Sequence, residues 1–431
     1  MSRRRGSAVL AALVAALAVA ATSLPRAWQV SATSQARAWH VPGPARASQP
    51  DTRRSPILVL VSFDGWRWDY IDRFSTPNLR AFAARGARAE RLIPSFPPLT
   101  FPNHYTIATG LYPAHHGIVA NAFRDPAMPE KFTMGGETAK DPAWWGGEPI
   151  WVTAINQGRR AAAMFWPGTE APIAGVRPTF WRAYDKAVTS SSRVDQVVEW
   201  LSLPEGERPA LVTVYFDEVD TAGHNFGVDS PELASATGHL DAALGQLIAG
   251  LARIGVADRT SIVVVSDHGM IQLSGDRVIL LDDYIDVETV NVLESGGFLA
   301  IEPKNGDAAA LEARLRGKHP ALAIYRRDEV PPRLHYHDSA RIAPIIGIPS
   351  DGWTVTTRNR LSERHAATHG FDPRDRSMGA LFVAAGPRIR AGIVLAPFEN
   401  VDVYNFLCSV LELRPAKNDG RDWLRGQLLR Q

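Results

Sequence analysis

Three continuous apolar runs, each followed by an aspartate within two residues, limit the folds that are open to this chain. They cover residues 57–63, 211–216 and 261–265 and are rich in β-branched side chains, as in strands that are buried on both faces. Between residues 231 and 253, leucines recur at intervals of three and four, which is typical of an amphipathic helix. Strands alternating with helices predict an α/β fold with a doubly wound, mostly parallel sheet. Residues 271–357 are less regular, and we expect a small antiparallel insertion there.

The first 54 residues have the features of a targeting segment and a linker. Three arginines precede an apolar run over residues 8–21, and small residues follow it, as in an export signal. We assign residues 1–23 to this signal, with an uncleaved N-terminal anchor as the alternative, and residues 24–54 to a flexible linker. We therefore expect an exported protein, periplasmic or extracellular, with one domain over residues 55–425.

Composition excludes several kinds of site and partner. The formal net charge of the 431 residues is +2 and no long basic run occurs, so we expect no specific binding of nucleic acid. We also expect no stable membrane insertion beyond the signal segment. The single cysteine, Cys408, can form no intramolecular disulfide and cannot build a cysteine-type zinc site. Any metal site must therefore use histidine and carboxylate ligands.

Carboxylates and histidines gather where the predicted strands end. Asp64 follows the first apolar run, and Asp267 and His268 follow the third. Asp220 and His224, after the second run, are spaced one helical turn apart. Because parallel strands bring their carboxyl ends to one edge of a sheet, we expect these five side chains to converge.

A further histidine pair, His365 and His369, follows a polar loop. Glycine follows only His369, so a tight turn can present that ring, and we prefer it to His365 as a ligand. Three Asp, three His and one hydroxyl would suffice for two zinc ions about 4 Å apart, with open positions for substrate. Six further histidines, interpreted as having no carboxylate partner nearby in sequence, are expected to be surface or packing residues: His104, His115, His116, His239, His335 and His337.

The hydroxyl is expected from Thr100, which stands just before a short helical pattern that ends at Gly110. Pro102 suits the first turn of such a helix, whose free N–H groups favour a phosphate-like anion. Metal coordination would lower the pKa of the Thr100 hydroxyl, so that attack on phosphorus gives a phospho-threonine intermediate. The amide of Asn121 is a candidate donor to the phosphoryl oxygens. Taken alone, Thr100 would be interpreted as only a helix cap, and the acidic and histidine clusters elsewhere in the chain reverse that preference.

Together these motifs resemble those of the nucleotide pyrophosphatase/phosphodiesterase family of the alkaline phosphatase superfamily. The resemblance covers the chain after the linker. It rests on the segments TFPNH at 100–104, GEPIW at 147–151, FWPG at 165–168, Asp220-x-x-x-His224, DHGM at 267–270 and His369-Gly370. It implies a doubly wound sheet of the alkaline phosphatase type. The chain departs from the family at Val219, where proline is common, and after His369-Gly370, where Phe371-Asp372-Pro373 replaces Tyr-Asp-Asn; neither change removes a ligand.

The resemblance also implies the cofactors and their ligands, two Zn²⁺ held by two sets of side chains. One set is Asp220, His224 and His369. The other is Asp64, Asp267 and His268, with Thr100 as both nucleophile and ligand.

The implied activity is hydrolysis of phosphodiester or pyrophosphate bonds in nucleotides and related esters, releasing nucleoside 5′-monophosphates. A nucleotide base would stack between Phe101 and Tyr184, and Glu170 falls where the family often has another acid. Alternatives on the same scaffold are a phosphomonoesterase or phosphonate hydrolase and a lipid (choline) phosphodiesterase. An inactive metal-binding protein is the alternative from another class. A sulfatase is disfavoured because Cys408 lacks the C/S-x-P-x-R context.

Overall fold

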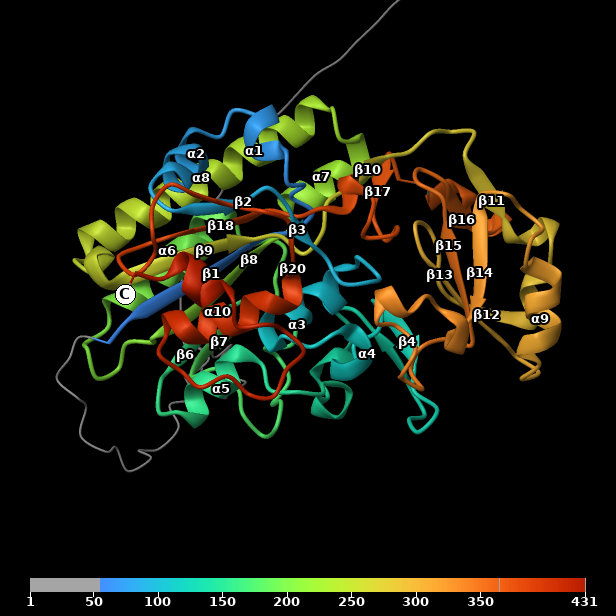
Figure 1. Ribbon diagram of the computed structural model, residues 1–431, viewed down its shortest axis with the longest axis horizontal. Coiled ribbons are helices and arrows are strands. Elements are labelled where there is room, and N and C mark those ends of the chain that lie inside the picture. Colours follow the sequence, from blue (N-terminus) through green and yellow to red (C-terminus); the bar gives the residue numbers. More distant parts are fainter. Residues whose placement is uncertain (1–54, 364, 431) are drawn as a thin grey trace, which may run out of the picture. The chain divides into compact units, whose positions relative to one another are not determined.

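An eight-stranded sheet forms the centre of the computed structural model, which describes residues 55–363 and 365–430 (Figure 1). The predicted export signal and linker lie outside the described residues. The strand order is β19-β2-β18-β9-β1-β8-β6-β7; β9, β1, β8, β6 and β7 run parallel, and β18 is antiparallel to β9 and β2. The bounds are β1 Ile57–Phe63, β2 Ala87–Ala89, β6 Ala161–Met164, β7 Phe180–Arg182, β8 Leu211–Phe216, β9 Thr260–Val265, β18 Phe382–Ala385 and β19 Ile393–Leu395. The predicted mostly parallel sheet is confirmed.

Strand β1 shows why helices cover both faces of this sheet. Leu58 and Leu60 belong to one apolar cluster and Val59 and Val61 to another, because successive side chains of a strand alternate between faces. Helices on the Val59 side are α2 Pro77–Ala84, α6 Ser190–Ser202, α7 Glu218–Phe226 and α8 Pro231–Arg253. Those on the Leu58 side are α3 Thr100–Thr109, α5 Ile150–Asn156, α10 Val403–Val410 and α11 Leu424–Leu428. Figure 1 shows α2 and α8 above the central strands and α10 and α5 below them, so the doubly wound arrangement is confirmed.

Helix α8 begins and ends where its sequence predicts. The Ser230 hydroxyl accepts the Leu233 N–H at 3.1 Å, and Pro231 fills the first helical position, where no N–H is needed. Its buried face includes Leu240, Leu244, Leu247 and Leu251. Burying each of these side chains contributes about 2 kcal/mol, so packing rather than propensity holds the helix on the sheet.

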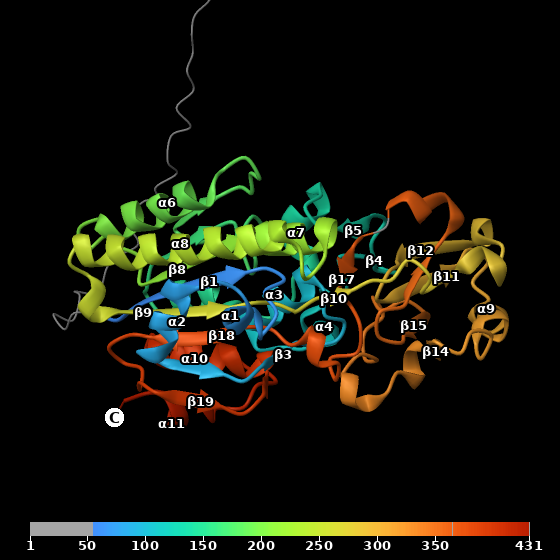
Figure 2. The ribbon, with the colours of Figure 1, turned by 90° about the horizontal axis from the view of Figure 1, so that it is seen from above.

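The insertion between β9 and β18 forms a separate layer, at the right of Figures 1 and 2. Its antiparallel sheet has the order β12-β13-β15-β14, with bounds β12 Val290–Glu294, β13 Leu299–Pro303, β15 Ile345–Pro349 and β14 Leu322–Arg326. Helix α9 (Ala308–Leu315) packs on one face, where Ile301, Leu311 and Ile345 share an apolar cluster. The predicted antiparallel insertion is confirmed, with one parallel pair beside it, β11 (Val278–Leu280) and β16 (Thr354–Thr356).

Some boundaries differ from the prediction for local reasons. Two further apolar runs, residues 161–166 and 378–384, also predict strands. The first, β6, ends at Met164 because Phe165 has a positive φ of 68°. The second, β18, begins only at Phe382, since Asp375 caps a short 3₁₀ turn over Arg376–Met378. The remaining helices and strand pairs are α1 Tyr70–Arg73, α4 Pro113–His116, β3 Leu92–Ile93 with β20 Phe398–Glu399, β4 Ala122–Arg124 with β5 Lys131–Thr133, and β10 Ile271–Gln272 with β17 Ala367–Thr368.

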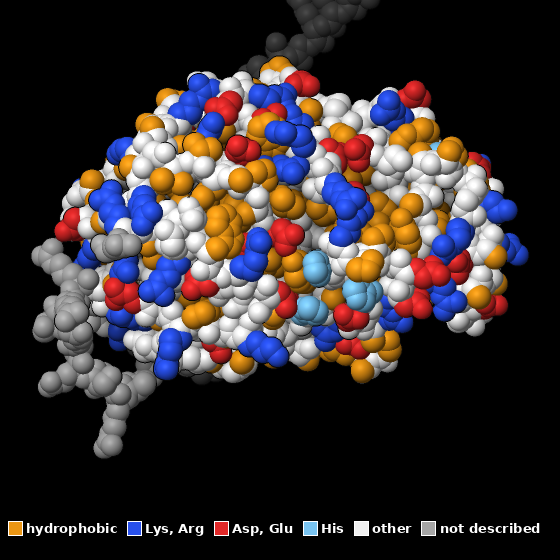
Figure 3. Space-filling model, viewed as in Figure 1, with side chains coloured by type: hydrophobic (Ala, Val, Ile, Leu, Met, Phe, Trp, Pro, Cys, Tyr) orange, Lys and Arg blue, Asp and Glu red, His pale blue; other side chains and the backbone are white. Residues whose placement is uncertain are grey.

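The surface carries both signs of charge. Basic and acidic side chains are interspersed over the face in Figure 3, in keeping with the formal net charge of +2. Among the described residues, none of the helices combines the length and the apolar character that a membrane span needs.

Candidate active site

The side chains predicted to bind metal lie at the carboxyl edge of the central sheet. Asp64 directly follows β1, and Asp267 and His268 follow β9, its parallel neighbour. Asp220 and His224 lie four residues apart in α7, which follows β8 on the other side of β1. The strand order β9-β1-β8 therefore brings together groups that are far apart in sequence, as predicted.

Two glycines allow the backbone segments to meet at this edge. Gly65 has a φ of +68°, and a Cβ there would lie 2.8 Å from the Cα of Asp220, so only glycine lets the end of β1 approach α7 this closely. Gly370 has a φ of +104° and follows His369, just after β17. The predicted tight turn after His369 is therefore present.

His268 joins two carboxylates in the first group of ligand atoms. Its Nε2 lies 3.0 Å from Oδ2 of Asp267 and 3.6 Å from Oδ1 of Asp64, and all three side chains are buried. The Tyr215 hydroxyl donates to the other oxygen of Asp64 at 2.6 Å. Burial, together with the charges of Asp267 and Asp220, raises the pKa of Asp64 well above its ordinary value. A bound cation would reverse that effect, because it favours the ionised carboxylate.

The second group centres on one oxygen of Asp220. His224 Nε2 lies 3.4 Å from Oδ1 of Asp220 and His369 Nε2 lies 3.7 Å from it, while the two Nε2 atoms are 3.1 Å apart. The Nδ1 atom of His224 faces the Ala367 carbonyl oxygen at 2.9 Å, and that of His369 faces the Pro98 carbonyl oxygen at 2.7 Å. Each Nδ1 thus carries the proton that it donates, and each Nε2 keeps a free lone pair, as in a metal ligand.

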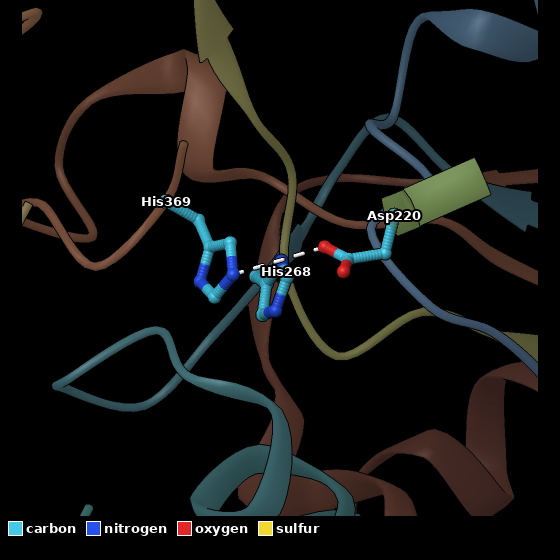
Figure 4. Close-up of side chains that lie close together, drawn as sticks. All are labelled: Asp220, His268 and His369. Atoms are coloured by element: carbon cyan, nitrogen blue, oxygen red, sulfur yellow. Dashed lines mark ion pairs between the residues drawn. The ribbon is translucent and has the colours of Figure 1, made fainter. Parts of the chain in front are cut away.

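The two groups of ligand residues contact each other through the stacked imidazole rings of His268 and His369. The ring centroids of His268 and His369 are 3.5 Å apart. Figure 4 shows that the two rings and the Asp220 carboxylate extend from different segments of the chain toward the same point. Ligand atoms of these three residues lie within 4.8 Å of one another, as do those of Asp64, Asp267 and His268. Burial, reinforced by the nearby histidines, lowers the pKa of His369 well below its ordinary value, so this ring is neutral, the form that binds metal.

Buried atoms without a hydrogen bond indicate whether the two groups of ligand residues are suited to bind a metal ion. The buried side-chain atoms that form no hydrogen bond within the described residues include four of these groups: Oδ1 of Asp64, Oδ1 of Asp220, Oδ2 of Asp267 and Nε2 of His268, the last two lying 3.0 Å apart as an ion pair. Leaving one such group unpaired costs about 1–3 kcal/mol, and more when it is charged. All four face the two clusters, and oxygen and imidazole nitrogen are donors that Zn²⁺ accepts. The residues therefore fit divalent cations.

Thr100 is the first residue of α3, one position inside the helix, and Leu99 rather than Thr100 occupies the cap position. Its side chain is buried, and the helix ends at Gly110, whose φ of 69° is left-handed, as predicted. His104, one turn later, was expected to be a surface or packing residue, and that expectation is incomplete. Its Nδ1 lies 2.8 Å from the Thr100 carbonyl and 3.4 Å from Oδ2 of Asp267. The i, i+4 spacing from Thr100 is the sequence signal that identifies it.

Asn121 lies beside the start of α3. Its Oδ1 accepts the Phe101 N–H at 3.0 Å, which turns the Nδ2 group away from that N–H. No acceptor for Nδ2 occurs among residues 55–363 and 365–430. The amide is therefore available to donate to a ligand placed at the helix start.

Tyr184 is held through its backbone N–H and its hydroxyl, while the residue as a whole stays 44% exposed. Its hydroxyl donates to Oδ2 of Asp217 at 2.9 Å, and its N–H donates to Oε1 of Glu170 at 3.0 Å. Asp217 is fixed in turn by a buried ion pair with Arg193 at 2.9 Å. Glu170 thus contacts Tyr184 directly. Phe101 packs against other aromatic rings, 6.0 Å from Trp145 and 6.1 Å from Phe132.

His365, the less favoured member of the histidine pair, lies next to the site, with its ring tilted by 46° against that of His224, and belongs to neither ligand group. Its ring centroid is 4.3 Å from that of His224. Of the other histidines, His337 forms an ion pair with its sequence neighbour Asp338 at 3.2 Å, so the expectation that it has no carboxylate partner nearby in sequence is wrong. His115 and His239 pair with carboxylates that are distant in sequence, Asp419 at 2.7 Å and Glu218 at 3.5 Å.

A cavity of about 250 Å³ opens beside the second ligand group. Its lining includes Asn121, His224 and His369, together with Glu294 and Arg360. Its walls thus combine the candidate reactive side chains with residues of the insertion.

Residues 58–372 match the family model described as type I phosphodiesterase/nucleotide pyrophosphatase. The chain belongs to this family.

Relatives and solved structures of the family agree with that assignment. An uncharacterized pyrophosphatase/phosphodiesterase of Schizosaccharomyces pombe is 38% identical over 380 residues, which cover 84% of this chain and 78% of that protein. A venom phosphodiesterase of Crotalus durissus collilineatus is 36% identical over 384 residues, and the match covers 86% of this chain but 46% of the venom protein. The chain thus spans about half the length of the venom phosphodiesterases it matches.

Murine ectonucleotide pyrophosphatase/phosphodiesterase 5 has been solved as an inactive threonine-to-alanine variant in complex with AMP. That structure has 34% sequence identity and a TM-score of 0.83, and the match covers 87% of this chain and 100% of the murine one. The predicted alkaline phosphatase-type fold is thereby confirmed.

Proposed function

We propose that this chain is a zinc-dependent hydrolase that cleaves phosphodiester or pyrophosphate bonds of nucleotides and related esters, releasing nucleoside 5′-monophosphates. One observation carries the proposal: the backbone at Thr100 is tied to both ligand groups. His104 Nδ1 lies 2.8 Å from the Thr100 carbonyl and 3.4 Å from Asp267 Oδ2. The Pro98 carbonyl, two residues before Thr100, lies 2.7 Å from His369 Nδ1. A hydroxyl at a helix start beside metal ligands is an arrangement suited to attack on phosphorus.

Two Zn²⁺ are the proposed cofactors, and the unpaired buried donors described above support this assignment. One ion is assigned to Asp220, His224 and His369. The other is assigned to Asp64, Asp267 and His268, with Thr100 as a further ligand. When bound, the ions supply Lewis acidity, which stabilises charge on the phosphoryl oxygens and favours the ionised Thr100 hydroxyl.

Thr100 is the proposed nucleophile. Its Oγ1 forms a bond to phosphorus while the bond from phosphorus to the leaving group breaks, and the hydroxyl proton passes to solvent. Water then attacks the phospho-threonine, releasing the monophosphate and restoring the hydroxyl. The Asn121 amide donates to a phosphoryl oxygen, where charge develops. The inactive threonine-to-alanine variant of the murine relative supports this role for a threonine.

We assign this activity to residues 55–425 and propose that the signal in residues 1–23 directs export to the periplasm or the extracellular space. The venom phosphodiesterases among the relatives support an exported enzyme.

A panel of substrates tests the proposed activity. Purified protein with zinc should hydrolyse dinucleotides, nucleotide sugars and bis-p-nitrophenyl phosphate, with kcat/KM at least about a hundredfold above that for p-nitrophenyl phosphate. A preference for the monoester would favour a phosphomonoesterase. A preference for glycerophosphocholine would favour the lipid-directed alternative. No turnover of any ester, with zinc bound, would favour an inactive metal-binding protein.

The base-binding prediction rests on the exposed, anchored ring of Tyr184. Stacking on an aromatic ring contributes about 1–3 kcal/mol per base, so Tyr184→Ala should lower kcat/KM for nucleotide substrates roughly tenfold to a hundredfold. Phe101→Ala should act in the same direction. Tyr184→Phe, which keeps the ring but loses the bond to Asp217, is the matched control and should retain most of the activity.

The same variants should barely change hydrolysis of bis-p-nitrophenyl phosphate. Equal losses on both substrates at unchanged thermal stability would mean that these rings do not select nucleotides.

A further inference from the structure

We infer that Glu294, a residue of the insertion, is a positioning residue that holds Asn121 in place for the reaction. This inference rests on the proposed function, in which the Asn121 amide donates to a phosphoryl oxygen. Glu294 ends strand β12, far from the ligand groups in sequence, yet it lines the same cavity as Asn121 and His369.

The contact itself is a hydrogen bond to the backbone. The Ala122 N–H, directly after Asn121, donates to Oε1 of Glu294 at 2.6 Å. The Asn121 carbonyl accepts the Met134 N–H at 2.8 Å, and its side-chain Oδ1 accepts the Phe101 N–H at 3.0 Å. Asn121 is thus held by Met134, which follows the β4–β5 hairpin, by Phe101 of α3 and, through Ala122, by Glu294 of the insertion. Of these three contacts, only the one with Glu294 involves an ionisable side chain.

A β-bulge explains why Glu294 points toward Asn121. In the pairing of β12 with β13, Val292 opposes Ile301 and Glu294 opposes Ala300, so Leu293 is an extra residue. Ile301 belongs to the apolar cluster covered by α9, whereas Ala300 and Leu293 belong to the cluster of the main domain. Residues that oppose each other across two strands share a face, so the bulge places Glu294 on the side of the main domain. Regular alternation would have placed it with Val292 instead.

The surroundings of Glu294 suit an ionised carboxylate that accepts a backbone hydrogen bond. Strand β12 packs against β4, whose first residue is Ala122. Burial raises the pKa of Glu294 to about 7, while the N–H of Ala122, the charge of Lys131 and the N–H of Asn121 oppose the rise. Assays at about pH 9 therefore keep this carboxylate ionised. Losing it would leave the part-buried N–H of Ala122 without this acceptor and let the Asn121 loop move.

A double-mutant cycle tests the inference. Glu294→Ala should lower kcat for bis-p-nitrophenyl phosphate about tenfold with little change in KM, because the Asn121 contact matters most in the transition state. Glu294→Gln keeps an acceptor oxygen and should stay within about threefold of the wild type. Asn121→Ala should cost about a hundredfold. In that background, Glu294→Ala should cost less than about twofold, because its effect passes through Asn121.

Glu302→Ala is the matched control. Glu302, on neighbouring β13, contacts Arg124 of β4 at 3.2 Å and Asn291 at 2.9 Å, so it also links the insertion to the hairpin, but it does not line the cavity. It should leave kcat unchanged. Melting temperature and zinc content, measured for every variant, show whether each has folded.

The possible results distinguish a failure of the proposed hydrolase activity from a failure of the positioning role of Glu294. Wild-type protein without diesterase activity would overturn the proposed function. Active wild-type protein in which Glu294→Ala has normal kcat, or in which the two substitutions have additive effects, would overturn the positioning role alone.

Discussion

Replacing Thr100 by Ala should lower kcat for phosphodiesters by at least about a thousandfold, because the reaction loses its nucleophile while the ligand groups remain. Thr100 contributes no side-chain hydrogen bond to the interior of α3 that would explain a collapse of the fold, and its carbonyl contact with His104 survives the substitution. Stopped assays with bis-p-nitrophenyl phosphate, with zinc content measured in parallel, provide the check. Thr100→Ser should keep part of the rate.

Thr109→Ala is the matched control for this substitution. Thr109 lies in the same helix and is buried, but its hydroxyl contacts only the backbone near the end of that helix, donating to the Tyr105 carbonyl at 2.7 Å and accepting the Leu111 N–H at 3.2 Å. Its replacement should leave kcat close to that of the wild type. If Thr100→Ala turned over at near wild-type speed, water would be attacking phosphorus directly and the phospho-threonine intermediate would be abandoned.

Removal of metal should abolish activity to a similar extent. Burial disfavours the ionised form of Asp267, but the neighbouring His268 and His104 outweigh it and hold the pKa of Asp267 well below its usual range, so the site presents a carboxylate ready for a cation. Dialysis against a chelator should lower turnover at least about a hundredfold, and added Zn²⁺ should restore it. Elemental analysis should give about two zinc ions per untreated chain.

Asp267→Asn should reduce the bound zinc, and Asp241→Asn is its matched control. Asp241 is also a buried aspartate, but it accepts the N–H groups of Asn78 and Leu79 at the start of α2, away from the ligand groups. Its replacement should lower the melting temperature without changing zinc content. Full activity of chelator-treated protein, with zinc shown to be absent, would contradict a metal-dependent reaction.

The sequence predicts elements best where local signals agree with packing. Strands β1 and β8 and helix α8 have the predicted bounds, because apolar runs and a capped leucine pattern carry the whole signal. The convergence of Asp64, Asp220 and Asp267 follows from one topological rule, that parallel strands share a carboxyl edge.

Contacts between distant segments were beyond the reach of sequence patterns. Three examples are the ion pair of His104 with Asp267, the hydrogen bond of the Tyr215 hydroxyl to Asp64 and that of the Ala122 N–H to Glu294. Each joins segments that become neighbours only through the order of the strands in the fold. The bulge before Glu294 has no glycine to mark it, since the extra residue is Leu293. Likewise, the early end of β6 depends on a positive φ at Phe165, a conformation that this residue type rarely adopts.

The ligand set has a consequence for the cohesion of the chain. Gly65 and Asp267 are 202 residues apart in sequence, so a cation held by Asp64 and Asp267 would close a very long loop, as a disulfide does in other proteins. This chain has one cysteine and can form no such internal bond. Binding would also favour the native state by mass action, since the unfolded chain offers no assembled site. Metal supply would then set how well the protein resists heat and proteolysis as well as how fast it turns over substrate.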